Sequence, residues 1–274
     1  MFAYRISLAL AVVACVLGCG RGAPENPTLS FIAVGQGDCA LIESGKWDVL
    51  IDAAPANEYG DAGERIVLPE LRSREVRALD LVFITHPDAD HVGGLQAIAR
   101  RHKIGAVVVN SKFADRREIT EVTERYGIKV ITVEKSMVFD LDSTMIRVYA
   151  PEAFDSDIDG SLLIRLEVDG TSALFTGDAG FEVEERAMMS GIDWDVDLLV
   201  AGHHGSKNST STAWLKATSP DIAVASAGRN NIYGHPHPDV EERLAEYGAE
   251  LLRTDELGTI RFEVVNGAFR QIRN

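Results

Sequence analysis

Four side chains that could bind a metal ion lie within six residues of the sequence: His86, Asp88, Asp90 and His91. They belong to the segment 85–94, which follows an apolar run from Leu79 to Ile84 that predicts a buried strand. Residues 95–102 predict a helix directly after the segment. Packing of a hydrophobic core does not require so many imidazole and carboxylate groups in one short segment. Divalent metals, in contrast, bind to imidazole nitrogen and carboxylate oxygen atoms. The segment therefore predicts a metal site at a strand-to-helix turn.

Further candidate ligands follow strands predicted later in the chain: Asp178, the pair His203 and His204, and then His235 and His237. In α/β folds, functional sites gather at the strand ends along one edge, so these residues can converge on the first turn. Taken alone, Gly177-Asp178 is typical of a turn, and the glycine-bounded pair of histidines is typical of a loop. Beside the first cluster, both segments favour metal ligands.

The order of predicted elements favours one domain made of two similar halves. Each half begins with a predicted antiparallel series of strands, at 29–52 and 145–176, and continues into alternating strands and helices. A predicted hairpin at 258–272 closes the chain. The longest linker between the halves is the segment 154–160. We therefore expect a single α/β sandwich with helices on both outer faces.

The first 18 residues predict a signal peptide, because a positive charge precedes a short apolar run from Ile6 to Leu17. Val16-Leu17-Gly18-Cys19 also resembles a bacterial lipobox, in which Cys19 would be lipidated and become the first residue of the mature protein. A cleaved signal with an incidental cysteine is the alternative. Residues 19–28 would form a tether, and residues 29–274 the folded domain. We expect an exported bacterial protein, periplasmic or at the cell surface, held to the membrane by a lipid anchor.

The charge limits the classes of function. The chain has 27 Lys and Arg against 42 Asp and Glu, which gives a formal net charge of −15. A protein that coats nucleic acid needs a basic surface, so DNA is possible as a partner but disfavoured. Compact basic clusters occur at 100–103 and 116–117, in predicted helices. A phosphodiester bound through two divalent cations remains compatible with this charge, since the cations neutralise nearby carboxylates.

Only Cys39 would remain as a free thiol, so no disulfide framework is possible.

Several motifs together resemble a known family. The segment from His86 to Gly94 resembles the signature motif of the metallo-β-lactamase fold superfamily, and Thr176-Gly177-Asp178 resembles its strand-end aspartate. Five more segments resemble the C-terminal hydrolase domain of ComEC competence proteins: Ala33–Asp38, Leu50–Asp52, Gly202–Ser209, Tyr233–Pro238 and Arg253–Glu256. The resemblance covers about 29–262. It implies a four-layer αββα sandwich with a dinuclear metal centre between the two sheets.

The resemblance also implies six metal ligands: His86, Asp88, Asp90, His91, Asp178 and His203. His86 and Asp88 would bind the first metal, with Asp88 standing where many relatives have a second histidine. Asp90, His91 and His203 would bind the second metal, and Asp178 would bridge both. Asp159 lies where related domains usually carry an Asn-rich pair, and it could serve as a further oxygen donor. An oxygen-rich first site favours Mn²⁺ over Zn²⁺, and both metals stay open.

Three residues would act in catalysis by the same resemblance. Asp90 would orient the hydroxide that forms at the two metals. His204 and His235 would contact substrate oxygens or protonate a leaving group.

The sequence therefore predicts an exported metal-dependent hydrolase of phosphodiesters, either a nuclease or a hydrolase of small phosphodiesters. Hydrolysis of a lactone or β-lactam is the alternative reaction, because the same hydroxide attacks carbonyl groups. A non-catalytic surface lipoprotein with a structural metal site is the alternative outside enzymes. The sequence does not predict the oligomeric state.

Overall fold

The computed structural model describes residues 24–58, 60–151, 156 and 160–273. The predicted signal peptide, Cys19 and Asp159 lie outside these residues, as does the first part of the predicted tether. In the described part of the chain, no helix has the length and apolar character needed to span a membrane.

The first of two large sheets is built mainly from the N-terminal half. Its strands are β1 (Thr28–Phe31), β2 (Ala40–Ser44), β3 (Trp47–Ile51), β6 (Ala78–Phe83), β7 (Lys103–Asn110), β8 (Lys129–Val133), β16 (Ile260–Val265) and β17 (Ala268–Ile272). They lie in the order β17-β16-β1-β2-β3-β6-β7-β8. Pairing is antiparallel from β17 to β3 and parallel from β3 to β8.

The second sheet repeats this change from antiparallel to parallel pairing. Its strands are β9 (Ser136–Leu141), β10 (Thr144–Tyr149), β11 (Leu163–Val168), β12 (Thr171–Phe175), β13 (Leu198–Val200), β14 (Ile222–Ala225) and β15 (Glu250–Arg253). The order is β15-β14-β13-β12-β11-β10-β9, antiparallel from β9 to β12 and parallel from β12 to β15. A two-stranded ribbon, β4 (Ala56–Asn57) with β5 (Gly60–Asp61), lies apart from both sheets.

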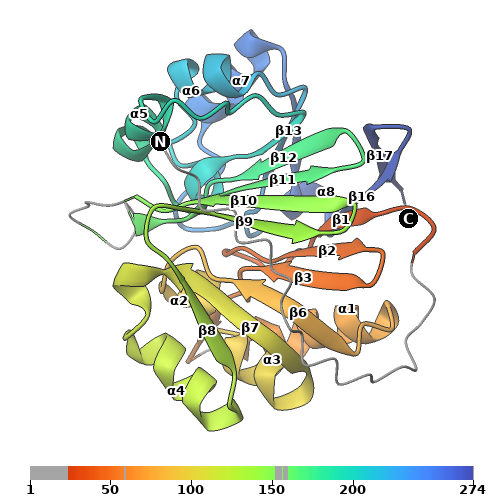
Figure 1. Cartoon of the computed structure of the whole chain (residues 1–274). Coiled ribbons are helices and arrows are strands. Elements are labelled where there is room, and N and C mark those ends of the chain that lie inside the picture. The colour runs from red at the N-terminus through yellow and green to blue at the C-terminus, as the bar shows by residue number, and fades with distance from the viewer. Residues whose placement is uncertain (1–23, 59, 152–155, 157–159, 274) are drawn as a thin grey trace.

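Helices cover the outer face of each sheet. The helices in the described part of the chain are α1 (Leu68–Ser73, entered through a π-helical segment at Gly63–Val67), α2 (Ala89–Val92), α3 (Leu95–Arg101), α4 (Arg117–Tyr126), α5 (Phe181–Met188), α6 (Thr212–Thr218), α7 (Pro238–Tyr247) and α8 (Thr254–Leu257), with single 3-10 turns at Ser111–Phe113 and Gly202–Gly205. Figure 1 shows α1, α3 and α4 below the first sheet and α5, α6 and α7 above the second. The predicted four-layer αββα sandwich is confirmed.

Three apolar layers hold the sandwich together. The largest lies between the sheets, where Phe31 stacks on Phe175 with ring centroids 5.8 Å apart and Phe83 meets Phe139 edge-on at 5.2 Å. The other two layers lie between each sheet and its helices. Each fully buried aromatic side chain stabilises the fold by about 1.5–3 kcal/mol. The outer layers follow from helix patterning, as in α4, where Ile119 and Val122 are buried while the charged residues face outward.

One strand of the two large sheets differs from the sequence-based expectation. The edge strand β9 was not predicted. Its burial pattern shows no strict alternation, and it includes the exposed residue Asp140. The predicted C-terminal hairpin forms as β16 and β17. It lies at the edge of the first sheet, where β16 pairs with β1 and Thr28 lies opposite Glu263.

Candidate metal centre

The carboxyl ends of several strands meet at one place, between the two sheets. Asp52 follows β3, His86 follows β6, Asp178 follows β12, and the histidine pair 203–204 follows β13. All four strands belong to the parallel parts of their sheets, so their carboxyl ends point the same way within each sheet. The convergence predicted for strand-end residues is therefore present in the fold.

The first cluster is shaped by a tight turn into α2. Asp88 is the N-cap of this helix, yet its side chain accepts no capping hydrogen bond. An N-cap aspartate normally accepts one from the first turn. Here Oδ2 of Asp88 lies 3.7 Å from Nε2 of His86 instead. Gly94 lets the turn approach β3, because a Cβ at this residue would lie 2.2 Å from the carbonyl oxygen of Ala53.

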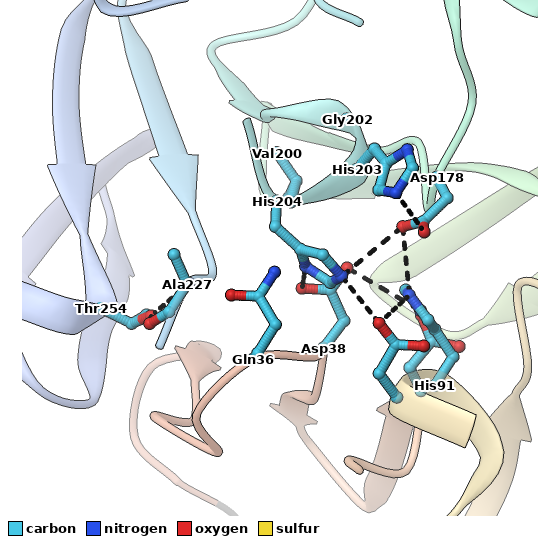
Figure 2. A network of polar contacts seen from close by, with 12 residues as sticks. Gln36, Asp38, His91, Asp178, Val200, Gly202, His203, His204, Ala227 and Thr254 are labelled. Carbon is cyan, nitrogen blue, oxygen red and sulfur yellow. Dashed lines mark hydrogen bonds and ion pairs between the residues drawn. The ribbon is translucent and has the colours of Figure 1, made fainter. Parts of the chain in front are cut away.

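Asp178 lies between two groups of candidate ligands. Its Oδ1 atom is 3.1 Å from Nε2 of His91 and 3.8 Å from Nε2 of His204. Its Oδ2 atom is 3.7 Å from Nε2 of His86 and 3.4 Å from Nε2 of His203. Figure 2 shows the rings of His91, His203 and His204 directed at this carboxylate. Each oxygen of Asp178 thus faces its own pair of histidines, which is the arrangement expected of a bridging ligand.

Aspartates complete both groups. Oδ2 of Asp90 lies 3.1 Å from Nε2 of His204 and 4.0 Å from Nε2 of His91. One atom from each of Asp90, His91, Asp178 and His204 falls within 4.8 Å of all the others, a spacing that can hold one metal ion. Asp88 stands beside His86 in the other group. We refer to these as the Asp90 group (Asp90, His91, His204) and the His86 group (His86, Asp88, His203), with Asp178 shared.

The histidine pair differs from its predicted division of roles. His203 was predicted to join Asp90 and His91, but His204 takes that position and His203 faces the His86 group. Both residues have left-handed backbone conformations, with φ of 49° at His203 and 57° at His204. Such conformations are costly for residues other than glycine and concentrate at functional sites. The sharp turn separates the two adjacent rings, whose planes are 74° apart.

Asp52 supports the centre by contacting one of its histidines, and it was not predicted as a site residue. It is buried, and its Oδ2 atom lies 2.9 Å from Nδ1 of His91. It also accepts hydrogen bonds from the backbone N–H and hydroxyl of Thr85, at 2.8 and 2.9 Å. A bond from Nδ1–H to a carboxylate leaves the Nε2 lone pair of His91 free for a metal. The available signals were its position at the end of a predicted strand and its place in the segment Leu50–Asp52, which resembles the related hydrolase domain.

Asp38 lies beside His204, a member of the Asp90 group. Its Oδ1 atom lies 3.6 Å from Nδ1 of His204, as Figure 2 shows. Burial alone would lower the pKa of His204, but the negative charges of Asp38 and Asp178 outweigh it and raise the pKa to about 10. Conversely, burial would raise the pKa of Asp178, and the imidazoles of His91 and His204 hold it well below its usual range. The centre therefore keeps the Asp178 carboxylate ionised and attracts positive charge.

The loop after the histidine turn is fixed by a buried carboxylate and a guanidinium group. Glu184 of α5 accepts hydrogen bonds from the backbone N–H groups of Thr210 and Ser211, the latter at 3.0 Å. Arg243 of α7 donates to the carbonyl oxygens of Ser209 and Thr210, at 2.8 and 3.0 Å. These contacts tie two outer helices to the loop that carries the histidine pair.

The two remaining candidates, His235 and His237, lie in different places: the first is near the centre, and the second caps a helix. His235 lies at the rim, with its ring centroid 5.8 Å from that of His203 and 6.4 Å from that of His204. Burial, together with the neighbouring His204 and His203, lowers the pKa of His235 to about 4, so the ring is neutral near pH 7. His237 is the N-cap of α7, and its Nδ1 atom accepts from the backbone N–H of Asp239 at 3.2 Å. His237 therefore serves the helix and does not face the centre.

The residues at the centre fit a pair of divalent metal ions. Among the described residues, Nε2 of His86, Nε2 of His91 and Oδ1 of Asp178 are buried without a hydrogen-bond partner. Buried polar atoms are nearly always paired, so unpaired atoms gathered at one site call for another partner. Imidazole nitrogens and carboxylate oxygens together suit Zn²⁺ and Mn²⁺. These atoms are the ones that would bind the metals.

Fold and site together define a class of protein: an αββα sandwich with a His/Asp centre at the strand ends between its sheets. The sequence profile of the metallo-beta-lactamase superfamily matches residues 32–229. The chain belongs to the metallo-beta-lactamase superfamily.

Curated relatives are competence and recombination proteins. The chain is 30% identical over 256 residues to ComE operon protein 3 of Bacillus subtilis (87% of this chain, 33% of the relative). It is 31% identical over 252 residues to competence protein ComA of Neisseria gonorrhoeae (91% and 34%). The chain thus spans about a third of the length of these relatives. The predicted resemblance to ComEC-type proteins is confirmed.

Solved structures share the fold at low sequence identity. The metallo-beta-lactamase fold protein YhfI of Bacillus subtilis aligns with a TM-score of 0.60 at 14% identity, covering 88% of this chain and all of YhfI. CmlA, a diiron beta-hydroxylase of Streptomyces venezuelae, aligns with a TM-score of 0.58 at 16% identity, covering 88% of this chain and 55% of CmlA. These similarities establish the architecture.

Proposed function

We propose that this protein is a metal-dependent hydrolase of phosphodiesters. The observation that carries the proposal is the Asp178 carboxylate, whose two oxygens each face a separate His/Asp group. Two divalent cations held there would lower the pKa of a water molecule to generate the nucleophile and would neutralise phosphate oxygens. The similarity to competence and recombination proteins also supports a phosphodiester substrate.

The chain's own residues would hold and orient the reacting groups. Asp178 and the two groups supply the metal ligands. Asp52 keeps the ring of His91 in position through its Nδ1 atom, and the Asp38 carboxylate places negative charge beside Nδ1 of His204. His235, neutral at the rim, can donate a hydrogen bond to a phosphate oxygen or to a leaving group. Its predicted role in catalysis remains a prediction.

The surface charge favours a small or single-stranded substrate over tight duplex binding. Arginines of both predicted basic clusters are paired with acids: Arg100 with Glu64, and Arg117 with Glu121 at 2.6 Å. Arg116 lies 3.7 Å from Glu118. Tight duplex binding needs cationic side chains that are free to replace counterions along the backbone. With a net charge of −15, the protein would bind phosphate chiefly through the metal centre.

Parallel assays test the proposed reaction. The purified protein, supplied with Mn²⁺ or Zn²⁺, is expected to hydrolyse bis-p-nitrophenyl phosphate or single-stranded DNA, and not nitrocefin. Removal of the metals with a chelator should abolish the activity, and adding them back should restore it. Turnover of nitrocefin or a lactone without turnover of any phosphodiester would favour the alternative hydrolase. Absence of turnover in all assays, despite bound metal, would favour a non-catalytic metal site.

We further propose that the protein is exported and anchored by lipid at Cys19. The support is the charged, apolar and lipobox-like sequence of the first 19 residues. In a bacterial host, the protein is expected in the membrane fraction, and the Cys19→Ser variant in the soluble or precursor fraction. The Cys39→Ser variant is the matched control and should stay with the membrane. Recovery of the unaltered protein in the soluble fraction would contradict the anchor.

A further inference from the structure

A loop at the rim of the centre exposes two large apolar side chains. Ile232 is 92% exposed and Tyr233 is 62% exposed. They follow β14 and precede His235. Single exposed apolar residues are common on protein surfaces and need no function. Ile232 and Tyr233 differ from such isolated residues because the ring of Tyr233 stacks on His235, near the metal centre.

Tyr233 continues a row of rings that begins at the metal centre. Its ring stacks on His235, with centroids 5.7 Å apart and planes 28° apart. His235 in turn lies 5.8 Å, centroid to centroid, from His203, whose Nε2 atom is 3.4 Å from Asp178. Tyr233 is therefore one ring removed from the candidate metal ligands. With one face against His235 and most of the residue exposed, the ring can accept another flat group.

The loop is held in place before any substrate arrives. The side chain of Asn231 donates to the carbonyl oxygens of Gly228 and His235, at 2.9 and 2.6 Å, and accepts from the backbone N–H of His235 at 2.9 Å. Pro236 packs against Gly205 so closely that a Cβ at Gly205 would lie 2.6 Å from the Cβ of Pro236. A preorganised loop lowers the entropy lost when a ligand binds.

We propose that Tyr233, flanked by Ile232, is a stacking platform for the nucleobase attached to the phosphodiester that the centre cleaves. This inference rests on the proposed function. Stacking on an aromatic ring suits any base, since every base has a flat π-face, and it needs no basic surface. The exposed ring of Tyr233, already stacked on His235, suits such a ligand. Recognition of a quaternary ammonium group normally takes a cage of several aromatic faces, whereas this rim presents one.

Three p-nitrophenyl phosphodiesters with the same leaving group test the platform: the thymidine 5′-ester, the choline ester and the methyl ester. The full-length protein, loaded with Mn²⁺ or Zn²⁺, is expected to show the lowest KM for the thymidine ester. Tyr233→Ala should raise that KM about tenfold and leave the methyl ester within twofold, because stacking on an aromatic ring is lost. Tyr233→Phe should keep the low KM, since it keeps the ring. Met189→Ala, at another exposed apolar residue, is the matched control.

Equal effects of Tyr233→Ala on all three esters, or no effect on any, would overturn the proposal. An effect confined to the choline ester would assign the ring to a cation instead. Hydrolysis of none of the three by the unaltered protein would contradict the proposed function. The platform is then tested separately by calorimetric titration with thymidine 5′-monophosphate, where weaker binding to Tyr233→Ala supports it and equal binding rejects it. Parallel titration with a short oligothymidylate distinguishes a free nucleotide from a single strand.

Discussion

The Asp178→Asn variant is expected to lose both metal ions and essentially all hydrolysis, with a rate at least about a thousandfold below that of the unaltered protein. Asparagine has nearly the same shape but offers one neutral carbonyl oxygen in place of two anionic ones. It therefore cannot serve the Asp90 group and the His86 group together. Metal content by mass spectrometry and turnover of bis-p-nitrophenyl phosphate are the two measurements.

Two comparisons separate loss of the bridge from general damage. The Asp140→Asn variant, at an exposed position of β9, should keep metal and activity. The His204→Gln variant should keep about one metal ion per chain, because the His86 group and Asp178 remain. If Asp178→Asn retained two ions and full activity, the carboxylate would not be a shared ligand.

The second large effect is expected at a residue that would not touch the metals. Asp52→Asn should weaken metal binding about 10- to 100-fold. Asp52 accepts from Nδ1–H of His91 and from Thr85, and an asparagine amide would turn a donor toward that ring. His91 would then favour the tautomer whose Nε2 carries the proton, and that atom could no longer bind a metal. Affinity is measured by competition with a chromophoric chelator.

A purely structural role for Asp52 would give a different result. The variant would unfold at a lower temperature without metal, and its metal affinity would not change once folded. The Asp80→Asn variant is the matched control, since Asp80 also accepts a backbone hydrogen bond, from Asp48 at 2.9 Å, but lies outside the centre. It should lose stability and keep metal affinity. Unchanged affinity in Asp52→Asn would reject the orienting role.

The architecture could be predicted from the sequence because the patterns that indicate its strands and helices are local and recur in both halves of the chain. Buried strands such as Ala78–Phe83 read as apolar runs, and each change from meander to strand–helix alternation marks the start of parallel pairing. The cluster of candidate metal ligands from His86 to His91 also lies within one short segment, so it could be recognised from the sequence. The sequence also placed Asp178 and the histidine pair at strand ends, and the fold brings them together.

What the sequence left open depends on backbone geometry and long-range packing. Nothing in two adjacent histidines tells which ring faces which group, because the left-handed φ angles of the turn decide it. Asp52 is an ordinary strand-end carboxylate until the fold brings it 2.9 Å from His91. His237 carries the same chemistry as His235, but its backbone position makes it a helix cap.

The return of the C-terminal hairpin to the first sheet has a consequence for how the protein folds. The central strand β1 pairs with β2 soon after it is synthesised, but its other edge waits for β16, near the end of the chain. Such distant pairing is slow, because a long loop must close before the contact is made. Until residues 260–265 emerge, the nascent chain exposes an unpaired strand edge that can associate with other chains. Strand β16 therefore protects an edge of β1 that stays open until residues 260–265 have been synthesised.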